Sequence, residues 1–380
     1  MFIDVHILQT VPFSNLNRDE NGTPKTVVYG GTLRARVSSQ SWKRATRLSL
    51  EKILTEPSTY RTRNPDKLLA EMLVASSYSA ENAENAEKIA SKVFLILGAK
   101  GTKEENKKDV VCLFSKEELL ALADVVKQHS DELLALPVTK EKRGGETKET
   151  SEFEQFKSIL TKVISQKRPN TIALFGRMLA GNPAVNVDAA IQVAHAFSVH
   201  EIEIEDDFFT AAEDIANTDE GLGSAHVNYT EFVSATFYRF ATIDFKELIA
   251  NCNNDSVAAI ELATTGLLGF CQSIPSGKNN ATAPHSMPDM VSIVVRTDRP
   301  VSYAAAFETP IKATDKGYAY PASQAIASYA IRIKRMLSID PVFLGTVTTL
   351  PDELPMGLGK NYESLNELID TAVQFAQDKP

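Results

Sequence analysis

Alternation of apolar and polar positions predicts β-strands over residues 2–11, 200–205, 226–243 and 290–297. In the first segment, Ile3, Val5 and Ile7 alternate with Asp4 and His6, which is the period of a strand with one buried face. We expect this to be a central strand, with Asp4 and His6 on its exposed face. The segment at 200–205 alternates isoleucine with glutamate and is therefore predicted to have an acidic face.

A helical period covers much of the remaining chain. It predicts helices over residues 39–54, 256–273, 322–337 and 365–375, several helices within 65–136, and helical structure over 151–198 interrupted at 181–183. The strongest elements follow one another as strand, helix, strand, helix, strand. This order is compatible with an α+β fold of the ferredoxin-like or RRM-like kind, interrupted by helical insertions.

The helix predicted after residue 38 begins with a serine pair and carries a basic stripe. Ser38 or Ser39 is a suitable N-cap, because its side-chain oxygen can accept from a first-turn amide. The positions on the stripe, at spacing i, i+3, i+4 and i+7, are Gln40, Lys43, Arg44 and Arg47. A helix N-terminus with cations nearby is a site for an anion such as phosphate. From spacing alone, a solvated basic face is an equally good interpretation.

Charge is distributed unevenly along the 380 residues. The whole chain has a formal charge of -9, which argues mildly against nucleic acid as a partner. Residues 18–63, however, contain an excess of lysine and arginine, whereas residues 195–220 contain nine carboxylates and neither lysine nor arginine. The chain is long enough for two domains, or for one domain with large insertions.

Motifs for catalysis or metal binding are missing from the sequence. The three cysteines are far apart, which indicates neither a disulfide framework nor a zinc site and favours a reducing cytoplasm. The six histidines lack metal-ligand spacing, and we find no nucleophile elbow, Walker loop or dinucleotide fingerprint. We therefore expect no catalytic residue, no metal and no cofactor. No apolar run approaches the length of a membrane span.

A long ordered block near the N-terminus resembles a known family. It consists of Leu16-Asn17-Arg18-Asp19, Tyr29-Gly30-Gly31, Arg34-Ala35-Arg36-Val37-Ser38-Ser39-Gln40-Ser41 and Lys43-Arg44-Ala45. Further matching pieces are Ala173-Leu174-Phe175-Gly176-Arg177-Met178, Ala194-His195-Ala196-Phe197, Gly223-Ser224-Ala225-His226 and Phe237-Tyr238-Arg239-Phe240. Together they resemble CasC, the backbone subunit of Cascade, the type I-E CRISPR surveillance complex.

The resemblance implies a fold and a division of the chain. CasC proteins have a modified RRM-like palm, a helical fingers domain and a protruding thumb. By analogy, residues 1–54 are the first part of the palm, 55–195 the mainly helical fingers, 196–224 the thumb, and 225–380 the rest of the palm with C-terminal helices.

The resemblance also implies a function. The protein is expected to polymerise head to tail along CRISPR RNA, to present the guide for pairing with target DNA, and to act in antiviral defence without catalysis. The implied partners are further copies of itself and subunits like CasA, CasB, CasD and CasE. Two alternatives stay open: a metal-dependent RNase that uses Asp206 and Asp207, as related type III backbone subunits do with a thumb carboxylate, and a generic single-strand RNA-binding module.

RNA contacts are expected from loops and helix ends, which hold phosphate and sugar without reading sequence. In CasC relatives, the methionine that matches Met178 wedges beside a displaced base. The thumb offers two adjacent aromatic residues, for RNA or for a neighbouring subunit. The full set of expected RNA-binding residues is Asn17, Arg18, Lys25, Arg34, Ser38, Ser39, Gln40, Lys43, Arg44, Arg47, Arg177, Met178, Phe208, Phe209, Lys278 and Asn280.

Overall fold

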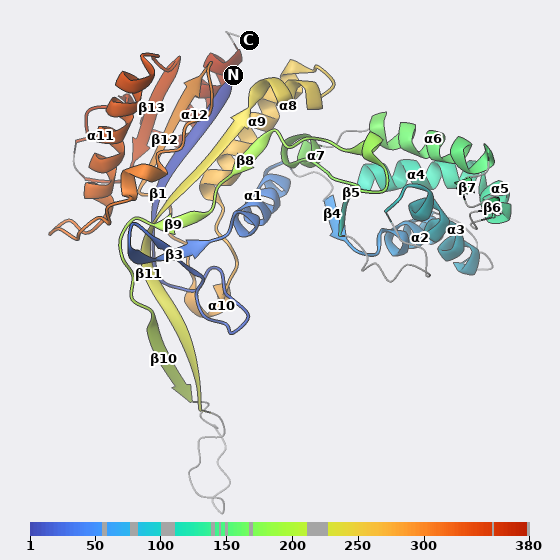
Figure 1. Ribbon diagram of the computed structural model, residues 1–380, viewed down its shortest axis with the longest axis horizontal. Helices are drawn as coiled ribbons and strands as arrows, with labels where there is room; N and C mark the ends of the chain where they lie inside the picture. The colour runs from blue at the N-terminus through green and yellow to red at the C-terminus, as the bar shows by residue number, and fades with distance from the viewer. Residues whose placement is uncertain are drawn as a thin grey trace, which may run out of the picture. The chain divides into compact units, whose positions relative to one another are not determined.

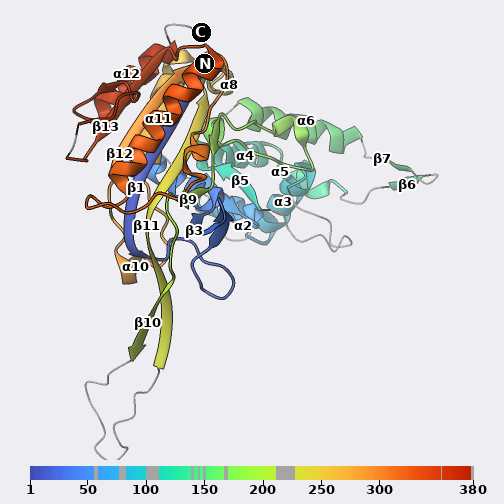
Figure 2. The same ribbon diagram turned by 60° about the vertical axis from the view of Figure 1, so that its left-hand side comes forward.

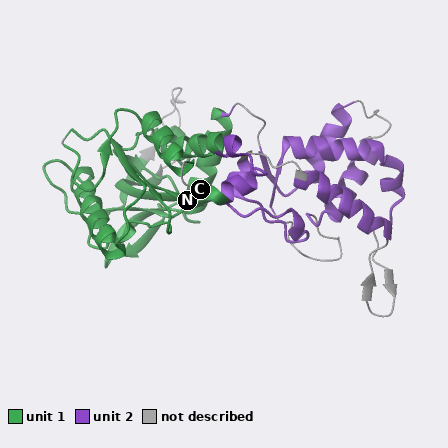
Figure 3. Cartoon of the chain, turned by 90° about the horizontal axis from the view of Figure 1, so that it is seen from above, with its two compact units in different colours: residues 1–53, 191–246, 260–380 green, residues 54–190, 247–259 purple. Residues whose placement is uncertain are grey.

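The computed structural model divides the chain into two compact units, shown in Figure 3. Unit 1 contains residues 1–53, 191–246 and 260–380, and unit 2 contains residues 54–190 and 247–259. The structure describes residues 1–54, 59–76, 83–99, 111–137, 141–143, 146–148, 151–166, 170–210, 227–351 and 353–377.

Unit 1 is built on a ten-stranded sheet (Figure 1). Its main path runs β14-β13-β12-β1-β11-β9-β3-β2, and β8 and β10 pair with β11 beside this path. The strands are β1 (Phe2–Ser14), β2 (Thr26–Tyr29), β3 (Thr32–Val37), β8 (Ile191–Val193), β9 (Ala196–Ser198), β10 (Glu205–Thr210), β11 (Val227–Asp244), β12 (Met290–Arg296), β13 (Phe343–Thr348) and β14 (Lys360–Asn361). The predicted strands at 2–11, 226–243 and 290–297 are therefore confirmed.

Two layers of helices cover the central strands, one on each face (Figure 1). Arg239 on β11 pairs with Ile7 on β1 and contacts Trp42 of α1 and Phe270 of α9, so these helices lie on the Ile7 face. The opposite face carries Leu8, which packs with Ile326 of α11. The helices assigned mainly to unit 1 are α1 (Ser39–Ile53), α9 (Ser256–Gln272), α10 (Asn279–Thr282), α11 (Ala319–Leu337) and α12 (Leu365–Gln377), with the short helix η3 (Ala304–Phe307).

Strand β1 is buried on both faces, which corrects the expectation that Asp4 and His6 are exposed. Both side chains are fully buried. The ring of His6 stacks on Tyr303 with centroids 3.9 Å apart, and Asp4 Oδ2 accepts a hydrogen bond from the Val301 amide at 2.8 Å. The segment before η3, together with α11, thus covers the second face of β1 (Figure 2). Bases therefore cannot stack on this part of the sheet.

A hairpin made by β10 and the first half of β11 extends beyond the rest of the sheet (Figure 1). Its strand begins at Glu205, so the predicted strand at 200–205 is wrong. That segment is an irregular crossover instead, because the Ile202 amide donates to the Leu33 carbonyl and His200 Nε2 accepts from the Thr236 amide. Part of the expected thumb, residues 211–224, lies outside the described residues.

Unit 2 is mainly helical and has its own apolar core. Its helices are α2 (Pro65–Ala75), α3 (Ala83–Ile96), α4 (Lys116–Gln128), α5 (Ser130–Ala135), α6 (Ser151–Gln166) and α7 (Asn170–Phe175), with the turn η2 (Pro183–Val185), while α8 (Phe245–Asn251) falls at the boundary between the units. Two small antiparallel sheets were not predicted: β4 (Thr59–Thr62) with β5 (Cys112–Ser115), and β6 (Glu141–Arg143) with β7 (Glu146–Lys148).

Helical structure was expected to continue to residue 198, and this is wrong beyond α7. The chain instead forms η2 and then enters the sheet of unit 1 as β8 and β9. These strands are only three residues long, too short to show a period of two. Within the described residues, no helix is both long and apolar enough to cross a membrane.

Candidate nucleic-acid interface

The N-terminus of α1 is capped by a serine, as the sequence predicted. The Ser41 amide donates to Ser38 Oγ at 3.3 Å, and the Trp42 amide donates to the Ser38 carbonyl at 3.1 Å. The first turn of the helix contains no acidic residue. The positive end of the helix dipole is therefore not compensated within the helix itself.

The body of α1 is fixed to the sheet by a buried arginine. The Arg239 guanidinium lies 3.7 Å from the Trp42 ring centroid and 4.6 Å from that of Phe270. It donates to Gln9 Oε1 and to the Phe270 carbonyl. Burial lowers the pKa of Arg239 to about 9, which leaves it protonated at neutral pH. Cation–π contacts of this kind are stronger when desolvated. They hold the inner face of α1 against the sheet, and its outer face is left exposed.

Two loops meet beside the start of α1. Asn17 Oδ1 accepts a hydrogen bond from the Ser38 amide at 2.9 Å, which ties the first loop to the helix cap. The second loop lies against the first at Gly277, where a Cβ atom would be 2.4 Å from the carbonyl oxygen of Leu16. Only glycine allows this approach of the two backbones. Two segments that are about 260 residues apart in the sequence are thereby brought to one helix end.

Cations from both loops gather at this point. Arg18 is exposed, and Lys278 adopts a left-handed conformation (φ 45°) with its ammonium 5.8 Å from the Phe232 ring. Burial, together with the nearby Arg18, lowers the pKa of Lys278, while Asp207 and Glu231 act in the opposite direction. The positive charges of Arg18 and Lys278 repel each other. An anion bound between them would reduce this repulsion and would therefore be favoured.

A second basic cluster lies along β3, and of its members the sequence predicted Lys25 as an RNA-binding residue but not Arg36 or His195. Arg36 Nη1 donates to His195 Nδ1 at 3.3 Å, and the Arg36 amide donates to the carbonyl of Lys25 at 2.7 Å. Burial, with Arg36 and Lys25 nearby, lowers the pKa of His195. Its imidazole is therefore neutral at physiological pH. Arg36 and His195 are 159 residues apart in the sequence. Both stand in segments that resemble CasC, and this was the one sequence signal that connected them.

The basic stripe of α1 is not uniform. Gln40 and Arg44 are exposed, and Ser39 and Lys43 are partly exposed. Arg47 instead forms an ion pair with Glu51 at 2.8 Å, with side chains only 13% and 10% exposed. The cationic surface of the helix is therefore concentrated in its first half, around Lys43 and Arg44.

Two of the predicted arginines are buried and support the fold. Arg34 donates to the carbonyls of Ser198 and Phe307 at 2.9 and 3.1 Å. In unit 2, Arg177 pairs with Glu118 at 2.6 Å and donates to the carbonyl of Val185. Because these guanidinium groups are hydrogen-bonded inside the protein, neither belongs to the candidate interface.

The other predicted residues lie on other elements. Met178 is 75% exposed and belongs to unit 2. Phe208 is 71% exposed on β10, with the ring of Tyr229 on β11 6.2 Å away. The backbone of Phe209 pairs with β11, but its side chain lies outside the part that the structure describes, and Asn280 is exposed on α10. Tyr229 was not predicted.

Comparison with known proteins places the chain in a family of CRISPR proteins. Residues 3–371 match the model of the CT1975-like proteins. The chain therefore belongs to this family, and the resemblance to CasC that its motifs indicated is confirmed. No curated protein matches.

Two solved structures are similar over almost their whole length. One, titled "CRISPR RNA-guided surveillance complex, pre-nicking", is 36% identical, with a TM-score of 0.84 over 99% of this chain and 100% of that chain. Another, titled "CRISPR RNA-guided surveillance complex", is 31% identical, with a TM-score of 0.73 over 98% and 99% of the two chains.

Proposed function

We propose that this protein is a non-catalytic backbone subunit of a type I-E CRISPR surveillance complex. Several copies bind head to tail along one CRISPR RNA and hold the guide for pairing with target DNA. Sequence choice then belongs to Watson–Crick pairing rather than to the protein. The partners are subunits like CasA, CasB, CasD and CasE, and the proposed location is the cytoplasm.

The observation that carries this proposal is the convergence at the N-terminus of α1. Asn17 is hydrogen-bonded to the Ser38 cap, the adjacent Arg18 interacts electrostatically with Lys278 of a distant loop, and Lys43 and Arg44 follow the cap in α1. Such a group suits contacts to phosphate and sugar. Backbone contacts of this kind are independent of base identity, as a protein that holds many different guides requires.

The topology of unit 1 supports an RRM-like palm as the frame of this interface. β1 lies between β11 and β12 and is antiparallel to both, and β8 and β9 follow on the far side of β11. Helix α1 comes after β1 in the chain, and α9 comes between β11 and β12. We further propose that unit 2 corresponds to the fingers and the β10–β11 hairpin to the thumb.

Charge reversal on α1 tests the proposal. The variant Lys43→Glu with Arg44→Glu is expected to lose guide RNA, because it replaces two cations at the interface with anions. With Lys43→Ala alone, the slope of log K against log salt should flatten by about 0.7 for each phosphate that the protein no longer neutralises. Both quantities are measured by titration of labelled guide RNA at several salt concentrations.

Lys52→Glu is the matched control, because Lys52 is an exposed cation in the last turn of the same helix. Guide binding and salt slope should remain close to those of the wild type. If the double reversal at Lys43 and Arg44 has no larger effect than this control, α1 has only a solvated basic face.

The RNase alternative is less well supported by the hairpin. Asp206 and Asp207 are successive residues of β10, so their side chains leave opposite faces. Among the described residues, no three histidine, cysteine, aspartate or glutamate side chains converge as metal ligands would. Addition of magnesium to guide-loaded protein with labelled target RNA separates the two functions, since an RNase would produce regularly spaced cuts.

A further inference from the structure

Strand β1 ends near an exposed phenylalanine with an unusual backbone conformation. Pro12 and Phe13 are the exposed residues of this strand, and the Phe13 side chain is 65% exposed. Its φ is 47°, in the left-handed region that bulky residues rarely adopt and that glycine adopts without strain. Because the ring is exposed, its packing does little to offset this strain. A glycine would suit the fold better here, which indicates that the ring has a role outside the core.

A β-bulge sets the conformation of Phe13. Three steps along β1, from Val11 to Ser14, are matched by two steps along β11, so β1 contains one extra residue. Bulges of this kind redirect a side chain out of the regular strand pattern. The Phe13 amide donates to Ser234 Oγ at 3.1 Å. Two residues further on, the buried Asn15 side chain donates to two backbone carbonyls, each at 3.0 Å. The backbone that carries the ring is therefore held at Phe13 and again at Asn15.

The bulge lies on the same face of β11 as a cation. Phe232 and Ser234 are two residues apart on this strand, so their side chains leave the same face. Ser234 holds the Phe13 amide, and the Lys278 ammonium lies 5.8 Å from the Phe232 ring centroid. The exposed Arg18 interacts electrostatically with Lys278. Phe13 is thus held close to the positive charge of the candidate interface, where the end of β1 and α10 lie beside the base of the hairpin (Figures 1 and 2).

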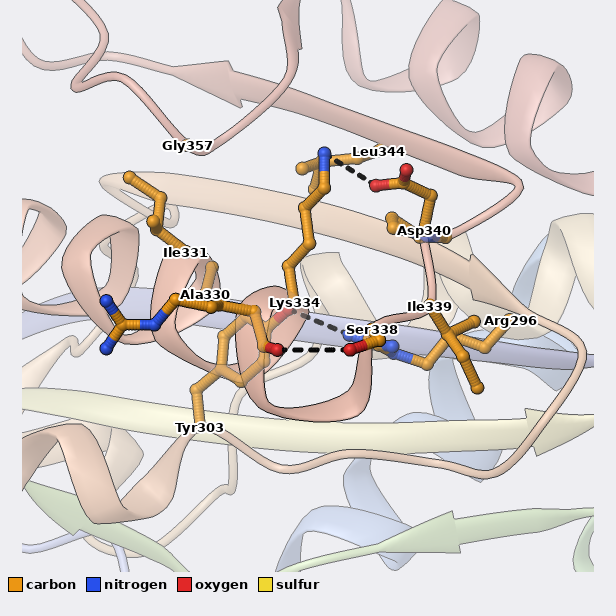
Figure 4. A pocket seen from close by; sticks show the side chains of 12 residues that line it. Arg296, Tyr303, Ala330, Ile331, Lys334, Ser338, Ile339, Asp340, Leu344 and Gly357 are labelled. Atoms are coloured by element: carbon orange, nitrogen blue, oxygen red, sulfur yellow. Dashed lines mark hydrogen bonds and ion pairs between the residues drawn. The ribbon is translucent and has the colours of Figure 1, made fainter.

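The exposed apolar surface at Phe13 differs from that near the C-terminal half of α11. There, Ile331 and Ile339 are 50% and 40% exposed, and they line one pocket together with Leu344 (Figure 4). Several apolar side chains around one hollow are typical of a surface that a protein or a small molecule covers. Phe13 instead offers a single ring, about the size of one nucleobase, close to two cations. An aromatic ring combined with cations is the usual composition of a site for single-stranded nucleic acid.

We propose that Phe13 stacks on a nucleobase of the bound guide RNA, with Arg18 and Lys278 on the neighbouring phosphates. This inference rests on the proposed guide-binding function and adds a contact to a base. Stacking on an aromatic ring is tolerant of sequence, because every base has a π face. The contact is therefore compatible with many different guides, and it fixes where one base lies along the protein.

An abasic scan of the guide tests this proposal. A short RNA that binds one subunit carries an abasic nucleotide at each position in turn, and its affinity for the wild type and for Phe13→Ala is measured by titration. On intact RNA, Phe13→Ala should bind about 5- to 150-fold more weakly, the range for loss of one stacked base. At one abasic position the wild type should lose the same factor, whereas Phe13→Ala should lose no more.

Three further variants separate stacking from a structural role. Phe13→Trp keeps an aromatic face and should bind at least as tightly as the wild type. Phe13→Leu keeps only apolar bulk and should bind as weakly as Phe13→Ala. Phe13→Gly relieves the left-handed strain, so it should unfold at no lower urea concentration than the wild type and still lose affinity. The slope of log K against log salt should be unchanged in all three, because stacking releases no counterions.

The proposal is overturned if no abasic position removes the difference between the wild type and Phe13→Ala, or if Phe13→Leu binds like the wild type. Normal binding of short RNA with lost cooperativity on long RNA would assign the ring to a contact between copies of the protein instead. If Lys43→Glu with Arg44→Glu loses guide RNA while every Phe13 variant binds normally, only the stacking contact is refuted. Failure of the wild type to bind guide RNA would refute the proposed function as well.

Discussion

At the scale of single residues, β1 carries two buried groups whose titrations oppose each other. Burial, reinforced by Arg296, lowers the pKa of His6 to about 3. Burial raises the pKa of Asp4 to about 6, although the Val301 amide and Arg296 act in the opposite direction. In the unfolded chain these pKa values are 6.5 and 3.8. Between about pH 4 and 6 the folded protein therefore binds fewer protons at His6 and more at Asp4.

The signs of the two effects follow from linkage. The contribution of His6 to the free energy of unfolding rises with pH. It is complete above about pH 6.5 and is lost as the pH falls. At Asp4 the free energy of unfolding falls as pH rises from about 4 to 6. The two slopes largely cancel in the wild type.

We predict that single substitutions expose these slopes with opposite sign. Relative to the wild type, Asp4→Asn should become more stable with rising pH, and His6→Phe less stable, by roughly 1 kcal/mol per pH unit between about pH 4.5 and 6. Urea unfolding at several pH values measures both. Slopes of the same sign would mean that the two groups do not titrate in the manner that their burial implies.

At the scale of elements, α1 depends on one hydrogen bond at its start. Ser38 Oγ accepts from the Ser41 amide, and the Ser38 amide donates to Asn17. Ser38→Ala should reduce the free energy of unfolding by about 1 kcal/mol and weaken guide RNA binding, because the first turn of the helix loses its cap while the backbone bond to Asn17 is kept. Denaturant unfolding and RNA titration measure the two effects.

Ser39→Ala provides the comparison, since Ser39 is the first residue of the helix and not its cap. Its stability should change by much less than that of Ser38→Ala. Equal losses for both variants would show that the Ser38 side chain does not act as the cap in solution.

The elements differ in how far their roles could be predicted. The bounds of α1 and α9 follow from local periodicity, and those of β1 and β12 were predicted to within three residues although both strands are buried on both faces. The burial of Asp4 and His6 depends on Tyr303 and α11, which lie near the other end of the chain, and β1 has no local signal for this second layer. Arg47 was placed on a basic stripe, yet its partner Glu51 stands four residues on, and this i,i+4 pair could have been found.

The candidate site shows the same limit. The cap and the exposed cations of α1 were predicted, because a serine before an amphipathic helix is a local pattern. That Gly277 packs on Leu16, and so brings Lys278 to Arg18, depends on backbone approach between distant loops. The burial of Arg34 depends equally on the carbonyl of Phe307. Neither contact has a signature in the residues around it.

At the scale of the whole molecule, exposed carboxylates are concentrated in β10 and the segment before it, whereas the exposed face of α1 is basic. Glu201, Glu203 and Glu205 precede Asp206 and Asp207, and all five are exposed. A chain with an acidic extension and a basic surface can contact a copy of itself head to tail, and such contacts form filaments when the rotation does not close. Exposed charge pairs contribute only about 0 to 1 kcal/mol each, so assembly should require RNA.

Removal of the hairpin tests this mode of assembly. Replacing residues 206–231 by a short glycine turn joins Glu205 to Phe232, which are paired across the strands. The variant should bind a short RNA as one subunit but lose cooperative filling of long RNA, because bound neighbours no longer raise each other's effective concentration. Native mass spectrometry across RNA lengths counts the subunits.

Phe208→Ala in the complete hairpin is the companion variant. This variant keeps all the acidic residues. If the exposed Phe208 ring contributes to the contact between copies, the variant should fill long RNA with reduced cooperativity. Cooperative filling of long RNA by the variant without a hairpin would refute a role for this extension in assembly.

The position of β1 in the sheet has a consequence for biosynthesis. This strand is translated first among the ten, yet its partners are β11 and β12, whose paired residues end at Asp244 and Arg296. At about 5 to 20 residues per second, a ribosome needs roughly 15 to 60 s after β1 before both neighbours exist. Until β11 is made, an apolar strand containing Ile3, Val5, Ile7 and Leu8 has no edge to join, and until β12 is made it has only one. The nascent chain therefore presents a binding site for chaperones until the last third of the protein emerges.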